Sequence, residues 1–290
     1  MVDGNYLIMQ SAQDIIRRWS DAAPFWEKHR ELIRQMFAPV TNSLVEDAKI
    51  GPGHAVLDIS TGPGEPALSI ASLVGTEGSV TGIDPVDEMV QAARREANRL
   101  RFKNVLFEAA PADDLPFSKD TFNAVVNRFG VMFVSSPVDT IREMLRVLKP
   151  DGRLALAVWR AADRNPFFYA ISRVMERFVN SPPPVPDAFD AFRFAEPGAL
   201  RDVAVEAGVA DPSERTLQFT IAATVSVEDF WTLRVEMSET LREKVSRLAA
   251  EQQAEVRHQA IESLREYSTG AGMSFPAEVL IVSGSKRWAA

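Results

Sequence analysis

The sequence predicts an α/β protein in which helices cover both faces of a mostly parallel sheet. Between Val56 and Trp159, short apolar runs alternate with longer amphipathic segments, and such alternation is typical of parallel strands joined by crossover helices. A loop containing Gly62 and Gly64 follows the first apolar run. Since open sheets of this class bind ligands beyond the carboxyl ends of their strands, the fold class also predicts where a site lies.

The individual elements follow from apolar periodicity and from the residues that interrupt it. We predict strands at 55–59, 79–83, 104–108, 121–127 and 153–159, with helices at 66–74, 85–101 and 138–149 between them. Amphipathic spacing predicts further helices in residues 11–49, ahead of the sheet. After Trp159 we expect a helix at 166–179, a proline-rich connector at 181–186, a helix at 197–207, a strand at 215–223, a helical segment at 227–267 and a strand at 277–283.

Composition narrows the classes of function. The 290 residues carry a net charge of -8, which argues against a nucleic-acid partner, because Lys and Arg contacts to phosphates supply much of that affinity. The absence of cysteine excludes disulfides and thiolate metal sites, and we expect no metal. We find neither a leader pattern nor an apolar run long enough to span a membrane, so we expect a cytoplasmic protein. The sequence leaves a homodimer open.

The segment from Val56 to Ala67 is the most informative in the chain. It combines a buried strand, the acid Asp58, the glycines Gly62 and Gly64, and the start of a helix, where Pro66 suits the first position. Glycine allows a sharp turn and a close approach of the backbone to a ligand, and a helix start attracts carboxylates or phosphates. The spacing also satisfies a dinucleotide-binding pattern, with Asp84 as a ribose ligand, so two cofactor classes fit this segment alone.

Three further motifs decide between these cofactors. The chain continues with Val80–Pro85 followed by Met89, then Ala112–Phe117, then Leu145–Leu154. With Val56–Ala67, this ordered series resembles the class I S-adenosylmethionine-dependent methyltransferases, in particular the small-molecule branch that includes the ubiquinone and menaquinone biosynthesis methyltransferases. The resemblance covers the chain from Val56 to Trp159.

The resemblance implies a Rossmann-like, doubly wound sheet of seven strands with a final antiparallel strand. It also implies S-adenosyl-L-methionine as cofactor and methyl transfer to a small organic acceptor. We divide the chain into an N-terminal helical cap at 1–50 and a methyltransferase domain at 51–290. Helical insertions at about 160–190 and 225–270 are expected to form a lid over the acceptor.

The motif matches also assign residues to parts of the cofactor. Asp58 would attract the ammonium group, Asp84 would accept from both ribose hydroxyls, and Met89 would pack under the adenine. The other expected cofactor-binding residues are Ser60, Thr61, Gly62, Gly64, Ala112, Asp113, Asn127 and Arg128. Structural alternatives accompany three of these assignments: a loop-capping acid at Asp58, a helix N-cap at Asp84 before Pro85, and core packing at Met89.

Two residues depart from the family pattern. Ser60 stands where the family most often has a glycine, which is tolerated if its backbone keeps an ordinary φ. Pro111 stands where the family commonly has an acid that accepts the adenine amino group. Either Asp113 substitutes for that acid, or backbone and stacking contacts hold the base.

Catalytic residues are unassigned, because in-line methyl transfer depends mainly on positioning and on water exclusion. If a general base acts, the histidines are His29, His54 and His258. His29 is the candidate that would cap the pocket, with a surface histidine as the alternative. The many aromatic residues favour an apolar or aromatic acceptor. Two rival functions are a nicotinamide-dependent oxidoreductase and a non-catalytic S-adenosylmethionine-binding protein.

Overall fold

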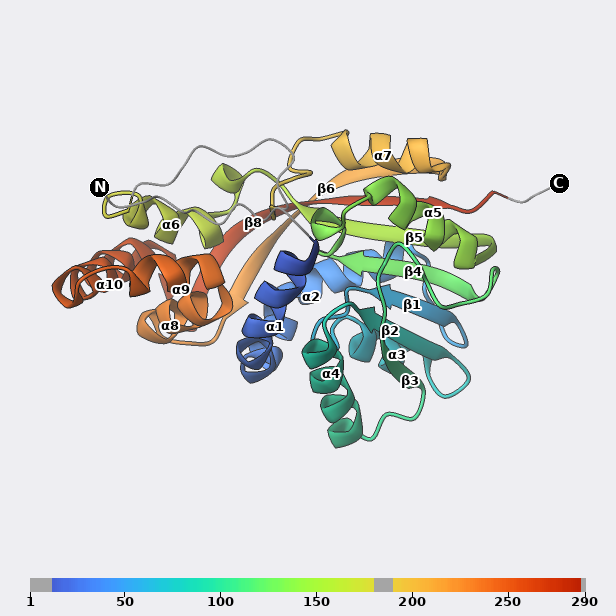
Figure 1. Cartoon of the computed structure of the whole chain (residues 1–290), viewed down its shortest axis with the longest axis horizontal. Coiled ribbons are helices and arrows are strands. Elements are labelled where there is room, and N and C mark those ends of the chain that lie inside the picture. The colour runs from blue at the N-terminus through green and yellow to red at the C-terminus, as the bar shows by residue number, and fades with distance from the viewer. Residues whose placement is uncertain (1–11, 180–189, 288–290) are drawn as a thin grey trace.

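The structure of the chain is a computed structural model that describes residues 12–179 and 190–287. Its centre is a single sheet in the order β3-β2-β1-β4-β5-β8-β6, with the short β7 paired to β8 (Figure 1). The strands are β1 (Ala55–Ile59), β2 (Ser79–Asp84), β3 (Val105–Ala109), β4 (Phe122–Arg128), β5 (Leu148–Trp159), β6 (Ala210–Ala223), β7 (Ser268–Thr269) and β8 (Gly272–Ser285).

The strand directions confirm the predicted fold class. The first five strands of the sheet run parallel to one another, whereas β8 lies antiparallel between β5 and β6. The neighbouring central strands β1 and β4 are buried along almost their whole length. This is expected where helices cover both faces of a parallel sheet.

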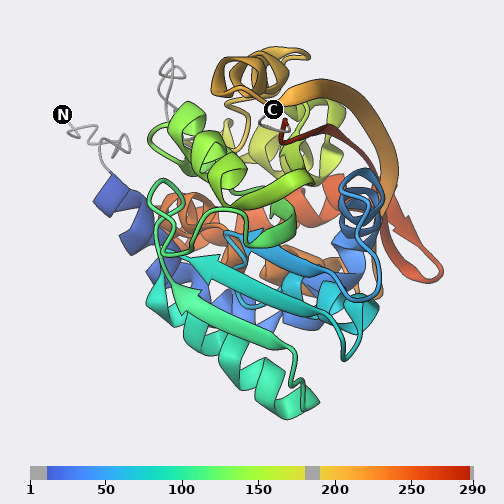
Figure 2. The same cartoon turned by 90° about the vertical axis from the view of Figure 1, so that its right-hand side faces the viewer.

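Helices pack on both faces of the sheet (Figures 1 and 2). One face carries α5 and α7, and the opposite face carries α2, α3 and α4. The helices are α1 (Ala12–Lys28), α2 (Arg30–Asp47), α3 (Ala67–Val74), α4 (Asp87–Leu100), α5 (Pro137–Val147), α6 (Pro166–Met175), α7 (Ala199–Ala207), α8 (Val227–Met237), α9 (Glu239–Ser246) and α10 (Ala250–Leu264). Short 3-10 turns are η1 (Val131–Phe133), η2 (Ala162–Arg164) and η3 (Arg265–Tyr267).

A group of helices gathers beyond the carboxyl end of β5. Beyond Trp159, the last residue of β5 to pair with β8, β6 and β8 continue as a paired ribbon out to the pair of Ala223 and Met273. The helices α6, α8, α9 and α10 surround this ribbon (Figure 1). Phe275 of β8 stacks on Phe230 of α8, with 4.8 Å between ring centroids. The helical group therefore has its own apolar centre next to the sheet edge where a site is expected.

Several predicted boundaries are wrong. The helical segment 227–267 is three helices and a 3-10 turn, because Ser238 ends α8 and caps α9 by accepting from the Leu241 N–H. β8 begins earlier than predicted because its first residues pair with the end of β6 beyond the main sheet. β6 begins earlier because Ala210 already pairs with Ser285, ahead of a register shift at Ser213. The predicted connector at 181–186 lies outside the described residues. Within the described ranges, no helix combines the length and apolar character needed to cross a bilayer.

Candidate functional site

Asp58 occupies the centre of the site, one residue before the end of β1. Its side chain is fully buried. Asp58 Oδ2 accepts from the Thr61 hydroxyl at 2.6 Å and from the Ala67 N–H at 3.0 Å, while Oδ1 is buried without a described partner. Burial raises the pKa of this carboxyl to about 7, although the Thr61 hydrogen bond and the charge of Arg128 oppose the shift. Asp58 thus caps the loop with one oxygen and leaves the other for a ligand.

Asp84 ends β2, the strand next to β1, and holds the same loop from the other side. The Gly62 N–H donates to Asp84 Oδ2 and the Val86 N–H donates to Oδ1, both at 3.0 Å. Burial raises the pKa of Asp84 to about 6, while these two bonds lower it. Helix α4 begins at Asp87 after an N-cap at Val86, so the predicted helix N-cap role of Asp84 is wrong. Each carboxylate oxygen still has a second acceptor position for a hydroxyl.

The backbone between the two carboxylates adopts unusual conformations. Ser60, Gly62 and Gly64 all have positive φ, at 60°, 55° and 111°. The expectation that Ser60 keeps an ordinary φ is therefore wrong. Phe129, just after β4, also has a positive φ of 64°. Strained non-glycine residues at two neighbouring strand ends are typical of a functional site.

Gly130 makes the conformation of Ser60 sterically possible. A Cβ added to Gly130 would overlap Ser60 Cβ and Oγ and would lie 2.6 Å from Asn127 Nδ2. At Gly62, an added Cβ would meet no atom within 4 Å, so this backbone faces open space. At Gly64, an added Cβ would lie 2.9 Å from Leu68. The loop is thus packed closely at its rear and open at Gly62.

The helix that follows the loop differs in one detail from the prediction. Helix α3 begins at Ala67, with Pro66 at its N-cap instead of its first position. The Ala67 N–H donates to Asp58, and the Leu68 N–H donates to the Gly64 carbonyl. Asp58 therefore occupies a helix-start N–H that the sequence assigned to a ligand carboxylate.

Asn127 and Arg128 end β4 and brace the loop. Asn127 is fully buried; its Nδ2 donates to the Ile59 carbonyl, and its Oδ1 accepts from the N–H groups of Gly130 and Val131. Arg128 instead points toward α2: Nη1 donates to Thr41 Oγ1 at 2.8 Å and Nη2 donates to the Glu65 carbonyl at 3.1 Å. These side chains hold the strand ends together, and a direct cofactor contact by either residue stays a prediction.

The three residues expected around the adenine differ in exposure. Met89 is 3% exposed and packs with Val86 and with Ala23 of α1. Ala112 is buried as well, whereas the side chain of Asp113 is exposed in the loop after β3. An adenine contact by Met89 or Ala112 thus agrees with their burial. The proposed substitution of Asp113 for the missing acid gains no support from its position.

Helix α1 lies across this part of the site. Trp19 and Trp26 pack against the cluster of Ala23, Val86 and Met89. Trp19 also makes an edge contact with Phe133 of η1, with ring centroids 5.5 Å apart. Because Val86 follows β2 and Phe133 follows β4, α1 spans the strand ends on both sides of β1. The N-terminal helices therefore act as a cover over the loop that joins β1 to α3.

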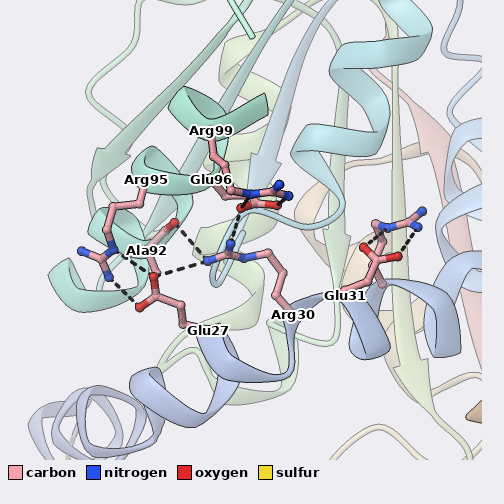
Figure 3. Close-up of polar contacts among 8 residues, drawn as sticks. Glu27, Arg30, Glu31, Ala92, Arg95, Glu96 and Arg99 are labelled. Atoms are coloured by element: carbon pink, nitrogen blue, oxygen red, sulfur yellow. Dashed lines mark hydrogen bonds and ion pairs between the residues drawn. The ribbon is translucent and has the colours of Figure 1, made fainter. Parts of the chain in front are cut away.

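A network of ion pairs fastens this cover to α4 (Figure 3). Arg30, at the start of α2, pairs with Glu96 at 2.6 Å and donates to the Ala92 carbonyl at 3.2 Å. Glu27 of α1 pairs with Arg95 at 2.6 Å. The side chains of Arg30 and Glu96 are 13% and 10% exposed, so this pair is screened less by water than a surface pair.

None of the three histidines lies beside the two site carboxylates. His29 sits between α1 and α2, where its Nε2 lies 2.5 Å from Glu236 Oε2 of α8. Its side chain is 17% exposed, so it joins the cover to the helical group and is not a free surface histidine. His54 precedes β1 at the opposite edge of the sheet, and His258 is exposed on α10.

Aromatic rings line the strand ends next to the loop. Phe129 stacks on Trp159, which ends β5, with centroids 4.3 Å apart and planes 4° apart. Phe37 of α2 makes an edge contact with both rings. The residue patterns of the sequence did not single out Phe37 or Gly130. The glycine after the β4 run was visible in the sequence, whereas no local signal distinguishes Phe37 from other core residues of its helix.

The sequence comparisons identify the same region. A methyltransferase-domain family matches residues 50–185. Over 113 residues the chain is 34% identical to the ubiquinone/menaquinone biosynthesis C-methyltransferase UbiE of Geotalea daltonii, an alignment that covers 39% of this chain and 48% of that protein. Residues 50–185 therefore match a methyltransferase domain. The chain spans about half the length of the curated relative it matches.

Similarity to solved structures extends further along the chain. The crystal structure of YcgJ from Bacillus subtilis superposes with a TM-score of 0.56 at 20% identity, covering 86% of this chain and 98% of YcgJ. The [4+2]-cyclase SpnF superposes with a TM-score of 0.53 at 18% identity, covering 93% and 97%. At these identities the superpositions show a shared fold. They do not show a shared reaction, because one fold hosts many functions.

We predict that Gly130→Ala destabilises the loop. The added Cβ overlaps Ser60, so the free energy of unfolding should fall by about 1 to 3 kcal/mol, as in other overpacked sites. The double variant Ser60→Gly/Gly130→Ala should recover part of this loss, because the Ser60 side chain is then gone. Thermal and urea unfolding of the two single variants and the double variant measure the coupling. An unchanged stability of Gly130→Ala would contradict the described packing.

We also predict that Arg30→Met loosens the cover. Removing Arg30 leaves the nearly buried Glu96 with only the exposed Arg99, so the free energy of unfolding should fall by about 2 kcal/mol or more. The matched control is Arg34→Met, whose ion pair with Glu31 joins residues of one helix and is solvent-exposed. The control should change stability by no more than about 0.5 kcal/mol. Equal effects in urea unfolding would refute the anchoring role of Arg30.

Proposed function

We propose that the protein transfers the methyl group of S-adenosylmethionine to a small, apolar or aromatic acceptor by in-line displacement. The observation that carries the proposal is the pair of buried carboxylates at the ends of β1 and β2 on either side of an open glycine backbone. The family match supports the cofactor class. The aromatic rings at the ends of β4 and β5 support the acceptor class.

The residues of the loop fit the parts of this cofactor. Asp58 has a buried oxygen without a described partner, and an ammonium group would satisfy it. Asp84 would accept from the two ribose hydroxyls, and the open backbone at Gly62 would allow the nucleoside to approach closely. Met89 and Ala112 would border the adenine. The exposed Asp113 leaves backbone and stacking contacts as the means of holding the base in place of the acid that Pro111 lacks.

When bound, S-adenosylmethionine supplies an electrophilic methyl group on a sulfonium. The protein's contribution is to hold an acceptor nucleophile in line with that methyl group and to exclude water. Helix α1, anchored by Arg30, covers the site, while Phe129 and Trp159 provide a flat apolar surface next to it. None of the three histidines borders the site in this arrangement, so the proposal uses no histidine as general base. We further propose, from the sequence alone, that the protein has no nucleic-acid partner and is cytoplasmic.

The sheet topology disfavours the oxidoreductase alternative. Dinucleotide-binding sheets of the common type have the parallel strand order 3-2-1-4-5-6. Here the antiparallel β8 is inserted between β5 and β6. The SpnF structure shares the fold and is named as a cyclase, which agrees with one fold hosting several reactions. It gives no support to the non-catalytic alternative, which turnover tests.

Turnover separates these alternatives. With methyl-labelled S-adenosylmethionine and a panel of phenols, quinones and amines, we expect acceptor-dependent transfer of label together with release of S-adenosylhomocysteine. A binding protein would bind the cofactor and release none of its product. An oxidoreductase would instead change the absorbance of a nicotinamide cofactor. Absence of transfer to the panel, together with tight cofactor binding, would favour the non-catalytic alternative.

Cofactor affinity should rise with pH below neutrality. Because burial raises the pKa of Asp58 to about 7, the carboxyl is largely protonated at pH 5.5, and a bound ammonium group favours its ionised form. The affinity for S-adenosylhomocysteine should therefore increase between about pH 5.5 and 7, by at most tenfold per pH unit for one ionisation. Isothermal titration measures this dependence. In Asp58→Asn the affinity should be weaker and the slope smaller, with the remainder due to Asp84, whose pKa of about 6 lies in the same window. An unchanged slope would contradict the assignment.

A further inference from the structure

Arg234 is a buried cation without a counter-ion among the described residues. It lies on α8 and is 8% exposed. Its guanidinium carbon lies 4.0 Å from the ring centroid of Phe167 and 5.3 Å from that of Phe168, both on α6. Within residues 12–179 and 190–287, its Nε is buried without a hydrogen-bond partner, and no charged group opposes the effect of burial on its pKa. The faces of two aromatic rings are the described contacts of this charge.

The isolation of Arg234 contrasts with other shielded arginines of the chain. Arg18, with 17% of its side chain exposed, pairs with Glu239, and Arg30 pairs with Glu96. Burying an unpaired cation is costly, and folded proteins normally pair such groups. Burial alone lowers the pKa of Arg234 to about 10, so the group still carries its charge near neutral pH. Because burying the Arg234 charge without a partner is unfavourable, we expect a bound ligand to provide the anion that pairs with it.

A path of ring contacts joins Arg234 to the methyltransferase site. The ring of Phe168 contacts both Arg234 and Trp159, with its centroid 4.9 Å from that of Trp159. Trp159 in turn stacks on Phe129, which follows β4 beside Asn127. Arg234 thus lies at the far end of a series of ring contacts that begins at the strand ends. An acceptor that lies along these rings would place one end near the cofactor loop and the other near the guanidinium.

We propose that Arg234 binds a carboxylate group of the methyl acceptor, so that the substrate is an aromatic or similarly flat apolar carboxylate. This inference rests on the proposed methyl transfer and adds the chemical class of its acceptor. A guanidinium donates two parallel N–H groups to a planar carboxylate. A single arginine between two aromatic side chains suits one negative charge next to an apolar ring.

Benzoate is the probe, with benzamide as its neutral isostere. Binding to the full-length protein is followed by tryptophan fluorescence, in the presence and absence of saturating S-adenosylhomocysteine. We expect saturable benzoate binding at millimolar concentration that is at least about tenfold tighter than benzamide binding, which corresponds to about 1.4 kcal/mol. Equal affinities, or no saturable binding of benzoate up to tens of millimolar, would overturn the proposal.

The variant Arg234→Met removes the charge and keeps a long, flexible side chain. It should bind benzoate no better than benzamide, while its affinity for S-adenosylhomocysteine stays unchanged. Because an unpaired buried charge is lost, its melting temperature should be equal to or above that of the parent protein. Arg234→Lys provides a second variant that keeps the charge, and it should retain the benzoate preference at reduced affinity. A benzoate preference that survives in Arg234→Met would refute the site.

Arg173→Met is the matched control. Arg173 also lies over an aromatic ring, 4.2 Å from the centroid of Tyr169, but its side chain is exposed on α6. This variant should keep the benzoate preference of the parent protein, and a loss equal to that of Arg234→Met would contradict the assignment. Titration with S-adenosylhomocysteine alone separates the two proposals. Failure of that titration would reject the methyl transfer, whereas loss of the benzoate preference would reject only the role of Arg234.

Discussion

The loop between β1 and α3 depends on two buried carboxylates that the folded chain only partly satisfies. Asp58 and Asp84 accept the N–H groups of Ala67 and Gly62, which fixes the backbone between them. One oxygen of Asp58 is left without a described partner. Burial raises the pKa of both groups, so a cationic ligand beside Asp58 would relieve the desolvation penalty of its ionised form. Local structure and ligand binding thus depend on the same atoms.

The surrounding elements keep this loop in place and out of water. Asn127 ties the ends of β1 and β4 together, and Gly130 leaves the space that the strained Ser60 requires. Helix α1 covers the strand ends, and Arg30 anchors the cover to α4. Beyond them, rings from α2, β5 and α6 form an apolar surface that leads to the helical group around β6 and β8. The loop between β1 and α3, the helical cover and the aromatic rings therefore lie next to one another at the carboxyl ends of the strands.

The sequence predicted the order of the strands and the residues of the loop, because both depend on local patterns. The apolar run that ends near Asp58, the two glycines and the acid Asp84 each have a signature within a few residues. The conformation of Ser60 could not be predicted in this way. It depends on the missing side chain of Gly130, 70 positions later in the chain.

Contacts between residues that are distant in sequence also explain why the role of Arg234 in the helical group was not predicted. Arg234 lies among apolar residues of α8. Its sequence neighbours Trp231 and Leu233 indicate only a buried helix face. Its isolation becomes visible only when the rings of α6 are placed against it. The divisions of the helical segment 227–267 were missed as well, because a serine that caps a helix can also occur on a polar helix face.

The most direct test of the central claim is a crystal structure of the full chain with S-adenosylhomocysteine bound. We predict the amino group of the ligand at Asp58 Oδ1, the ribose hydroxyls at Asp84 and the nucleoside against the backbone of Gly62. A ligand bound elsewhere, or a loop that stays empty in a crystal grown with saturating ligand, would contradict this prediction.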